Sequence, residues 1–327
     1  MYVAGVASSI DDLLDALTTA LTAAGWSNTG NVWYKSGCYV SLGKTGNRLV
    51  LDGGTGQSAG TLTGQGPIGL NSLGTKVYLN VFGSNGIQYP ASYYIHLFDS
   101  PVEVYMLVND SGTRWSRLAF GKSPSAGIST GNWHAGTSGR NVDYIDNYYS
   151  GCSLHPQGRG AFNLSGFMIE GFTNWDVYNF DGAYSNAFFH HGLDSATWSR
   201  SGFEANPDSN IAAATNLCDY PSQIYCMTPN YPLWKAQPNT LNGQAMLIRI
   251  NLYIKRASGK MSMVGQLNHS RHIRNTYYND GDIVNLGGDR WKVYPMTVKN
   301  TSYPDGNDDS TYGHSGTLAI AVRYDGP

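Results

Sequence analysis

The side chains that could bind a metal are few and widely separated along the chain. His190 and His191 are adjacent, and together with His155 or Asp194 they could form a metal site. No HxH, HExxH or paired Cys/His spacing accompanies them, and adjacent residues of a strand face opposite sides of its sheet. The pattern therefore predicts no metal site and no cofactor.

Hydrolysis of a sugar would need two opposed carboxylates. The available acids are Glu103, Glu170, Asp176, Asp181 and Glu204. Glu103 lies in an alternating strand pattern, where a solvated side chain explains it equally well. Sugar binding without chemistry has more support, because exposed aromatic loops are sufficient for it.

Nucleophilic catalysis has still less support. No GxSxG elbow appears, and Cys152 or any serine would need a distant His and an acid that the sequence does not place. We therefore predict that the protein is not an enzyme and has no catalytic residues.

The composition is typical of a β-rich protein with many turns. The 327 residues include 40 Gly, 23 Tyr and 8 Trp, and 13% are charged. Asp and Gly favour turns, whereas Glu, which favours helices, is rare here. A net charge of −2 without a long Lys/Arg cluster argues against nucleic-acid binding. We expect the run Arg271-His272-Ile273-Arg274 to be a solvated or partner-facing loop.

Four cysteines are too few and too widely spaced for a disulfide framework in a chain of this length, and none forms a CxxC pair. They are Cys38, Cys152, Cys218 and Cys226. We favour free thiols made in a reducing cytoplasm, although Cys218 and Cys226 could form a disulfide in an oxidising compartment. No apolar run approaches the roughly 18 residues of a membrane span, and acidic residues from Asp11 onward interrupt any signal-peptide pattern.

The clearest β pattern is a predicted three-stranded antiparallel meander at 93–98, 102–108 and 114–120. Asp99-Ser100-Pro101 and Asn109-Asp110-Ser111-Gly112 separate these runs, as expected for tight hairpins. In the middle run the even-numbered residues are all apolar, and Glu103 shares the other face with Tyr105 and Leu107. Because only one face carries a charge, we predict a sheet with at least one packed side.

One amphipathic helix is predicted from Ser9 to Ala24. Ser9 is a suitable N-cap, Asp11 and Asp12 suit the positive end of the helix dipole, and Gly25 suits the C-terminus. The apolar stripe consists of Ile10, Leu13, Leu14, Leu17, Leu21 and Ala24.

Further strands are predicted at 31–34, 38–42, 47–51, 68–70, 76–82, 245–254, 261–267, 282–286, 290–298 and 316–324. Three polar or Gly-rich segments, 53–66, 121–139 and 300–313, are predicted to be long loops.

We therefore predict a mainly β fold of the α+β type, with antiparallel sheets or a sandwich, one N-terminal helix and long irregular loops. Residues 1–139 form a helix and meander block, 140–239 an irregular aromatic-rich insertion, and 240–327 a C-terminal β block that completes the same sheet system.

Three stretches together resemble a family of tailed-bacteriophage virion structural proteins. The first is the helix beginning Ser9-Ile-Asp-Asp-Leu-Leu and ending at Gly25-Trp26. The second is Arg114-Trp-Ser-Arg-Leu-Ala-Phe-Gly121-Lys, followed by Gly131-Asn-Trp-His-Ala-Gly-Thr-Ser. The third is Gly287-Gly-Asp-Arg-Trp-Lys-Val-Tyr-Pro295 with Ser315-Gly-Thr-Leu-Ala-Ile-Ala-Val-Arg-Tyr324. The resemblance covers the two regular blocks and not the middle segment.

This resemblance implies a non-enzymatic tail or baseplate subunit, located in the virion and assembled in the host cytoplasm. Its partners would be other virion proteins and further copies of itself in a symmetric oligomer. Two alternatives stay open. One is a capsid decoration protein; the other is a receptor- or glycan-binding virion protein that contacts a host surface glycan through exposed aromatic side chains. The candidate aromatics are Trp175, Tyr178, Trp198 and Trp234.

Overall fold

The computed structural model describes residues 1–65, 76–79, 87–110, 114–124, 130–137, 187–190, 198–201, 223–225, 238, 241–255, 261–302 and 316–327. Within these ranges the fold is mainly β, with antiparallel sheets and a single helix, as the sequence predicts.

The described part of the chain contains one helix and 20 strands. In order they are β1 (Tyr2–Ala7), α1 (Ile10–Ala23), β2 (Ser27–Thr29), β3 (Val32–Lys35), β4 (Cys38–Thr45), β5 (Arg48–Gly54), β6 (Gly56–Ser58), β7 (Thr61–Thr63), β8 (Val77–Leu79), β9 (Ala91–Asp99), β10 (Val102–Asp110), β11 (Arg114–Lys122), β12 (Asn132–Gly136), β13 (Ala187–Phe189), β14 (Ser199–Ser201), β15 (Gln223–Tyr225), β16 (Ile248–Lys255), β17 (Met261–Arg274), β18 (Ile283–Leu286), β19 (Asp289–Pro295) and β20 (Leu318–Arg323).

The helix is confirmed, with its predicted caps. The Ser9 side chain accepts a hydrogen bond from the Asp12 amide, and Gly25 has the positive φ of a residue that ends a helix. The apolar stripe is buried against the first sheets, with Leu13, Leu17 and Leu21 fully covered. Burial of this stripe holds α1 across the N-terminal strands.

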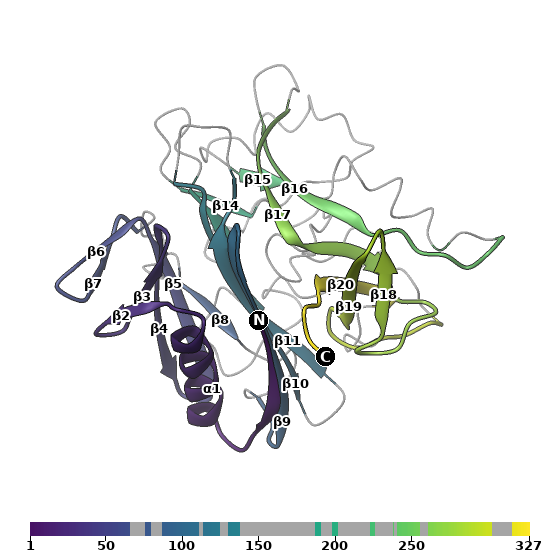
Figure 1. Cartoon of the computed structure of the whole chain (residues 1–327), viewed down its shortest axis with the longest axis horizontal. Helices are drawn as coiled ribbons and strands as arrows, with labels where there is room; N and C mark the ends of the chain where they lie inside the picture. Colours follow the sequence, from purple (N-terminus) through teal and green to yellow (C-terminus); the bar gives the residue numbers. More distant parts are fainter. Residues whose placement is uncertain are drawn as a thin grey trace, which may run out of the picture.

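The strands form one large sheet and two small ones. The large sheet has 13 strands in the order β1-β9-β10-β11-β12-β13-β14-β15-β16-β17-β20-β19-β18, and a five-stranded sheet has the order β2-β3-β4-β5-β8. Figure 1 shows α1 and the five-stranded sheet on one side of β9, β10 and β11, with the C-terminal strands on the other side. The two regular parts of the chain therefore contribute to one folded-over sheet.

The predicted meander is confirmed as β9, β10 and β11, and it is the middle layer. Every residue of β10 is buried. Val104 and Met106 pack in one core with α1, β4 and β5, whereas Tyr105 and Leu107 pack in a second core with β16, β17 and β20. The expectation of a solvated Glu103 is wrong, because that side chain lies on the second buried face and is 0% exposed.

Three predicted loops are wrong at least in part. Within 53–66, β5 continues to Gly54 and β6 and β7 form a small hairpin. Within 121–139, β12 adds a fully buried strand beside β11. The run from Arg271 to Arg274 belongs to β17 between β16 and β20, so it is a strand and not a loop, and all of it but Arg271 is buried. In each case pairing with a distant strand supplies burial that local composition does not reveal.

Most of the middle segment, 140–239, lies outside the described residues, as do the predicted strand at 68–70 and most of the loop at 300–313. The described parts of the middle segment contribute β13, β14 and β15, which link β12 to β16 in the large sheet. No helix in the described part of the chain is long and apolar enough to cross a membrane.

Candidate functional site

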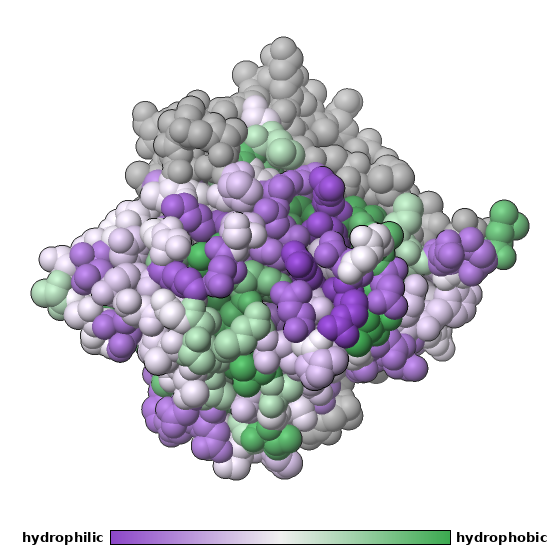
Figure 2. Space-filling model, in the orientation of Figure 1, coloured by the Kyte–Doolittle hydropathy of each residue, from purple (hydrophilic) through white to green (hydrophobic). Residues whose placement is uncertain are grey.

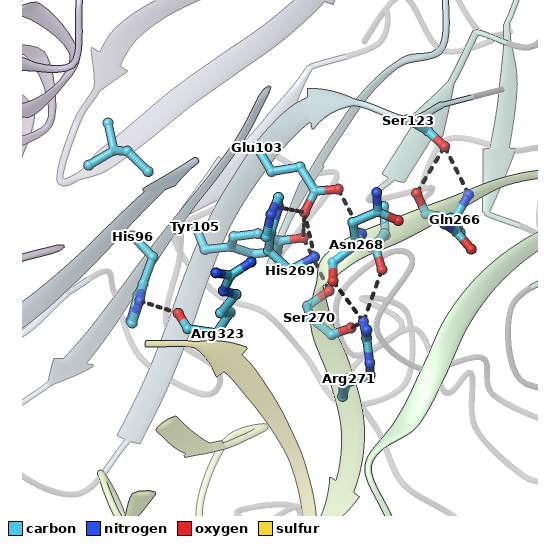
Figure 3. A network of polar contacts seen from close by, with 12 residues as sticks. His96, Glu103, Tyr105, Ser123, Gln266, Asn268, His269, Ser270, Arg271 and Arg323 are labelled. Atoms are coloured by element: carbon cyan, nitrogen blue, oxygen red, sulfur yellow. Dashed lines mark hydrogen bonds and ion pairs between the residues drawn. The ribbon is translucent and has the colours of Figure 1, made fainter. Parts of the chain in front are cut away.

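The main polar site is a buried carboxylate between β10 and β17. Glu103 Oε2 accepts hydrogen bonds from the Tyr105 hydroxyl at 2.8 Å, the His269 amide at 2.9 Å and His269 Nδ1 at 3.0 Å. Glu103 Oε1 accepts one from the Asn268 amide at 2.8 Å. Figure 3 shows these groups pointing toward one another from the two strands. Both carboxylate oxygens are therefore bonded to the chain itself.

The backbone donors to Glu103 come from an irregular part of β17. Ile250 of β16 pairs with Leu267, but its neighbour Arg249 pairs with Arg271, so the residues between them on β17 bulge out of that ladder. Pairing with β20 begins only at Ser270. The amides of Asn268 and His269 thus have no strand partner in either ladder, and these are the two amides that Glu103 accepts.

Arg271 satisfies the carbonyls of the same bulge. Its Nη1 donates to the carbonyls of Asn268 at 2.8 Å and Ser270 at 2.6 Å, and more weakly to that of Leu267 at 3.3 Å. The guanidinium also lies over the Trp291 ring, 4.5 Å from its centroid. Burial lowers the pKa of Arg271, and nearby Tyr105 and Glu103 oppose that shift. An arginine stays protonated at neutral pH, so this cation balances the buried carboxylate.

The residues beside Glu103 on the neighbouring strands leave room for this arrangement. Gly121 of β11 pairs with Glu103, and a Cβ there would lie 2.4 Å from the Val102 carbonyl oxygen and 3.1 Å from Glu103 Cγ. Phe98 of β9 pairs with Glu103 on the other side, and its ring stacks on the His269 ring at 4.0 Å and 4°. A glycine and a flat ring therefore flank the carboxylate.

The protonation states follow from the contacts. Burial and the charge of Glu103 raise the pKa of Tyr105 well above its usual value, so the phenol keeps its proton and donates a hydrogen bond to the carboxylate. The Ser270 hydroxyl lies 3.1 Å from the same phenol oxygen. Because a carboxylate oxygen only accepts, the proton on the His269 ring is assigned to Nδ1.

A carboxylate–imidazole pair can also orient a general base. The His269 ring is stacked under Phe98 and is 5% exposed. Ser270 is hydrogen-bonded to Tyr105, whose phenol is in turn bonded to Glu103. These contacts join two layers of the fold.

Further polar contacts join the same two layers on either side of Glu103. Ser123 Oγ donates to the Gln266 carbonyl at 2.9 Å and accepts from its amide at 2.8 Å, as a strand partner would. His96 accepts a hydrogen bond from the Tyr294 hydroxyl at 2.8 Å, and Arg117 donates to the Met296 carbonyl at 2.5 Å. The layers are therefore linked by hydrogen bonds along β9, β10 and β11.

At one end of the contact between the two layers, a lysine is surrounded by tyrosine rings. Lys292 Nζ donates to the Tyr2 hydroxyl at 3.0 Å and lies 4.9 to 5.3 Å from the ring centroids of Tyr2, Tyr94 and Tyr324. Burial and the neighbouring Tyr324 raise the pKa of Tyr2 to about 12. The cage is filled by the protein's own cation, so it links β1 to the C-terminal strands.

Only some of the predicted site residues lie in the described ranges. Trp198 is 6% exposed, its Nε1 donates to the Gly64 carbonyl at 2.8 Å, and its ring meets the rings of His134 and His190 edge-on. Its described contacts are those of a packed core residue. The remaining candidate aromatics lie outside the described residues; they are Trp175, Tyr178 and Trp234.

The structure describes only some of the residues named in the metal and thiol predictions. His190 Nδ1 lies 3.0 Å from Thr130 Oγ1, while His155, His191 and Asp194 lie outside the described residues. Among the described residues, no cluster of three His, Cys, Asp or Glu side chains could hold a metal. Cys38 is a buried free thiol whose pKa burial raises to about 12.

The other acids considered for sugar hydrolysis and the other three cysteines lie outside the described residues. They are Glu170, Asp176, Asp181, Glu204, Cys152, Cys218 and Cys226.

Sequence reasoning missed the role of Glu103 and of the bulge on β17. One signal was present, because Glu103 shares its strand face with Tyr105 and Leu107, which are apolar enough to predict burial of the whole face. No protein-family model matches the chain, and no curated protein matches it in sequence.

The first prediction concerns the charge of the buried carboxylate. In Glu103→Gln, one amide group faces N–H or O–H donors in either orientation, so at least one buried donor loses its acceptor. We expect the free energy of unfolding to fall by about 3 kcal/mol, measured by urea denaturation. The matched control is Asp99→Asn, because the Asp99 side chain is 76% exposed and paired with Lys35 at the surface. It should cost less than about 1 kcal/mol; equal losses in the two variants would contradict the role given to Glu103.

The second prediction concerns pH. His272 is 1% exposed, neither ring nitrogen has a hydrogen-bond partner within the described structure, and burial lowers its pKa to about 3. The unfolded chain binds the proton below about pH 6.5. The stabilisation that the folded protein gains by keeping this ring neutral is therefore complete above about pH 6.5. It is lost as the pH falls toward 3.

We therefore expect His272→Leu to reduce the loss of stability between pH 6 and pH 4 by about 2–3 kcal/mol, or about 1.4 kcal/mol per pH unit. At pH 7 the variant should be at least as stable as the natural chain, since its cross-strand neighbours Ile248 and Ile320 are apolar. Urea denaturation at each pH gives the slopes. Tyr277→Leu, at a residue that is 68% exposed, is the control. An unchanged slope in His272→Leu would show that this histidine is not the source.

Proposed function

We propose that the chain is a non-enzymatic structural subunit of a bacteriophage virion, located in the tail or baseplate and acting through protein–protein contacts. The observation that carries the proposal is the closed network around Glu103. This carboxylate is 0% exposed, and both its oxygens are bonded to the chain itself. This polar cluster thus holds sheet layers together.

A subunit of a large assembly must keep its shape while forces act on its surface. A buried, fully satisfied polar network gives one arrangement of the layers, because shifting either strand leaves a charged group without partners. The caged Lys292 and the Ser123–Gln266 contact fix the same layers at other points. These features support a rigid structural role.

The resemblance to tailed-phage virion proteins supports the position in the particle. Two of its stretches contribute residues that the fold uses at the layer interface. Arg117 and Gly121 belong to the second stretch, and Lys292 and Tyr294 belong to the third. The stretches that carry the family resemblance therefore also carry residues that join the two layers.

The glycan-binding alternative has no specific support in the described residues. Trp198, the candidate aromatic that the structure describes, has its ring and its N–H engaged within the protein. We therefore argue the structural proposal alone.

The proposal is tested by the mass of the purified protein in solution. Light scattering behind a sizing column should give a closed oligomer, three or six times the 35.5-kDa mass of the chain or a multiple of these. The oligomer should persist over a tenfold dilution. A monomer at every concentration, in both low and high salt, would contradict assembly through contacts between copies.

A further inference from the structure

Among the described strands, β1 has an edge that no other strand pairs with. Met1 and Leu97 exchange both backbone hydrogen bonds, at 2.8 and 2.9 Å, which makes them a hydrogen-bonded pair. Such pairs alternate along an antiparallel ladder, and Tyr2 pairs with His96 in continuous register through Ala7. The N–H and C=O groups of Tyr2, Ala4 and Val6 therefore point away from β9, at the first position of the large sheet.

This edge lacks the features that usually protect an edge strand. β1 contains no charged residue and no proline, and its register with β9 has no bulge. Ala4 is exposed and the side chain of Val6 is 68% exposed. The outer backbone of β1 is therefore open to pairing with another strand.

A groove runs beside the free edge, between β1 and α1. Its volume is about 420 Å³, and its apolar wall includes Val3, Ala16, Ala20 and Ala23. Figure 2 shows green and pale green atoms over the region where α1 and β1 lie side by side in Figure 1. The groove is thus of a size to take apolar side chains from a strand added to β1.

Gly5 brings an aromatic ring into this groove. A Cβ on Gly5 would lie 2.4 Å from the Tyr93 hydroxyl, so the absence of a side chain allows the ring to lie across the edge strand. Tyr93 also lines the groove. The strand therefore offers backbone groups at its edge and a flat ring above it.

Acidic groups outnumber basic ones in the groove. Asp12 and Asp15 line it, no Lys or Arg side chain does, and the Met1 ammonium that also lines it donates a hydrogen bond to the Leu97 carbonyl. Asp12 accepts hydrogen bonds from Ser8, and Asp15 has no side-chain partner among the described residues. Asp11, outside the groove, is paired with Lys44. An occupant that complements this groove carries a positive charge.

We infer that β1 and α1 bind an extended segment of a neighbouring, different protein chain by strand addition. The segment adds beside β1 through the backbone groups of Tyr2, Ala4 and Val6. Apolar side chains at alternate positions enter the groove, and a Lys or Arg meets Asp12 and Asp15. This inference deepens the proposed function and rests on it only for the identity of the neighbour.

A second copy of this chain fits the groove less well. The opposite edge of the large sheet is β18, and charges of both signs lie around it: Asp280, Asp282 and Asp289, with Arg290 and Lys292 of β19 and Arg323, which pairs with Asp289. Pairing a second β1 with this edge would bring a second Asp12 and Asp15 toward the first pair, which is unfavourable. β18 offers no excess of positive charge that would complement them. Charge therefore favours a basic segment of another protein.

The test is selection of displayed random octapeptides on the full-length protein and, in parallel, on Ala4→Pro. Proline removes the outward N–H of residue 4 and leaves the bonds to β9 intact. We expect enriched peptides with alternate apolar residues and a Lys or Arg. Synthetic labelled copies should bind Ala4→Pro at least tenfold more weakly by fluorescence anisotropy. Val6→Lys, a change at an exposed side chain, should weaken binding similarly and serves if Ala4→Pro does not fold.

Two further measurements fix the site. Bound peptide should slow hydrogen exchange of the Ala4 and Val6 amides, and Asp15→Lys should reverse the preference from basic to acidic peptides, while Leu286→Lys on β18 should change neither. The inference is overturned if no peptide is enriched, if enriched peptides bind Ala4→Pro equally, or if they are not basic. It is also overturned if, without peptide, the Ala4 and Val6 amides exchange slowly and this protection is lost on dilution. That result would identify a second copy of the chain as the occupant of the edge. The light-scattering result does not depend on any of these outcomes.

Discussion

A carboxylate removed from water must be given hydrogen-bond donors, and this constraint organises the fold. Glu103 lies in the central strand, where neither face reaches solvent, so its donors must come from another layer. They come from the bulge at Asn268 and His269, which leaves its own amides unpaired in both ladders. An irregular strand and a buried charge thus satisfy each other, and neither would be stable alone in this position.

This pairing explains how a single sheet can form two of three layers. In sheet order β11 to β16 lie between β10 and β17, yet Glu103 and His269 are in direct contact. The sheet therefore folds back on itself, and the meander is enclosed between α1 with the five-stranded sheet and the C-terminal strands. The polar groups around Glu103 are bonded to one another inside the protein. We therefore expect binding to occur at the surface, where β1 leaves an unpaired edge beside an acidic groove.

Local patterns in the sequence predict the local elements well. The cap at Ser9 and the apolar stripe predict α1, and alternation between turn residues predicts the meander, because both signals depend on neighbouring residues. Local composition predicts loops around Trp133 and within 53–66, where the structure has a strand and a hairpin, because their burial comes from distant partners. For the same reason, the sequence leaves a solvated Glu103 as an equally good interpretation. A buried carboxylate is recognisable only when the strand that satisfies it is known, and nothing near Glu103 in sequence indicates His269.

The central claim is that Glu103 closes the bulge of β17, and hydrogen exchange at the Asn268 and His269 amides tests it most directly. These amides have no strand partner, so without the carboxylate they would exchange through small local openings. The account predicts that in the natural protein they exchange only on global unfolding, as slowly as amides of β10. Fast exchange at both amides, with β10 still protected, would contradict the account and would leave the layers held together by apolar packing alone.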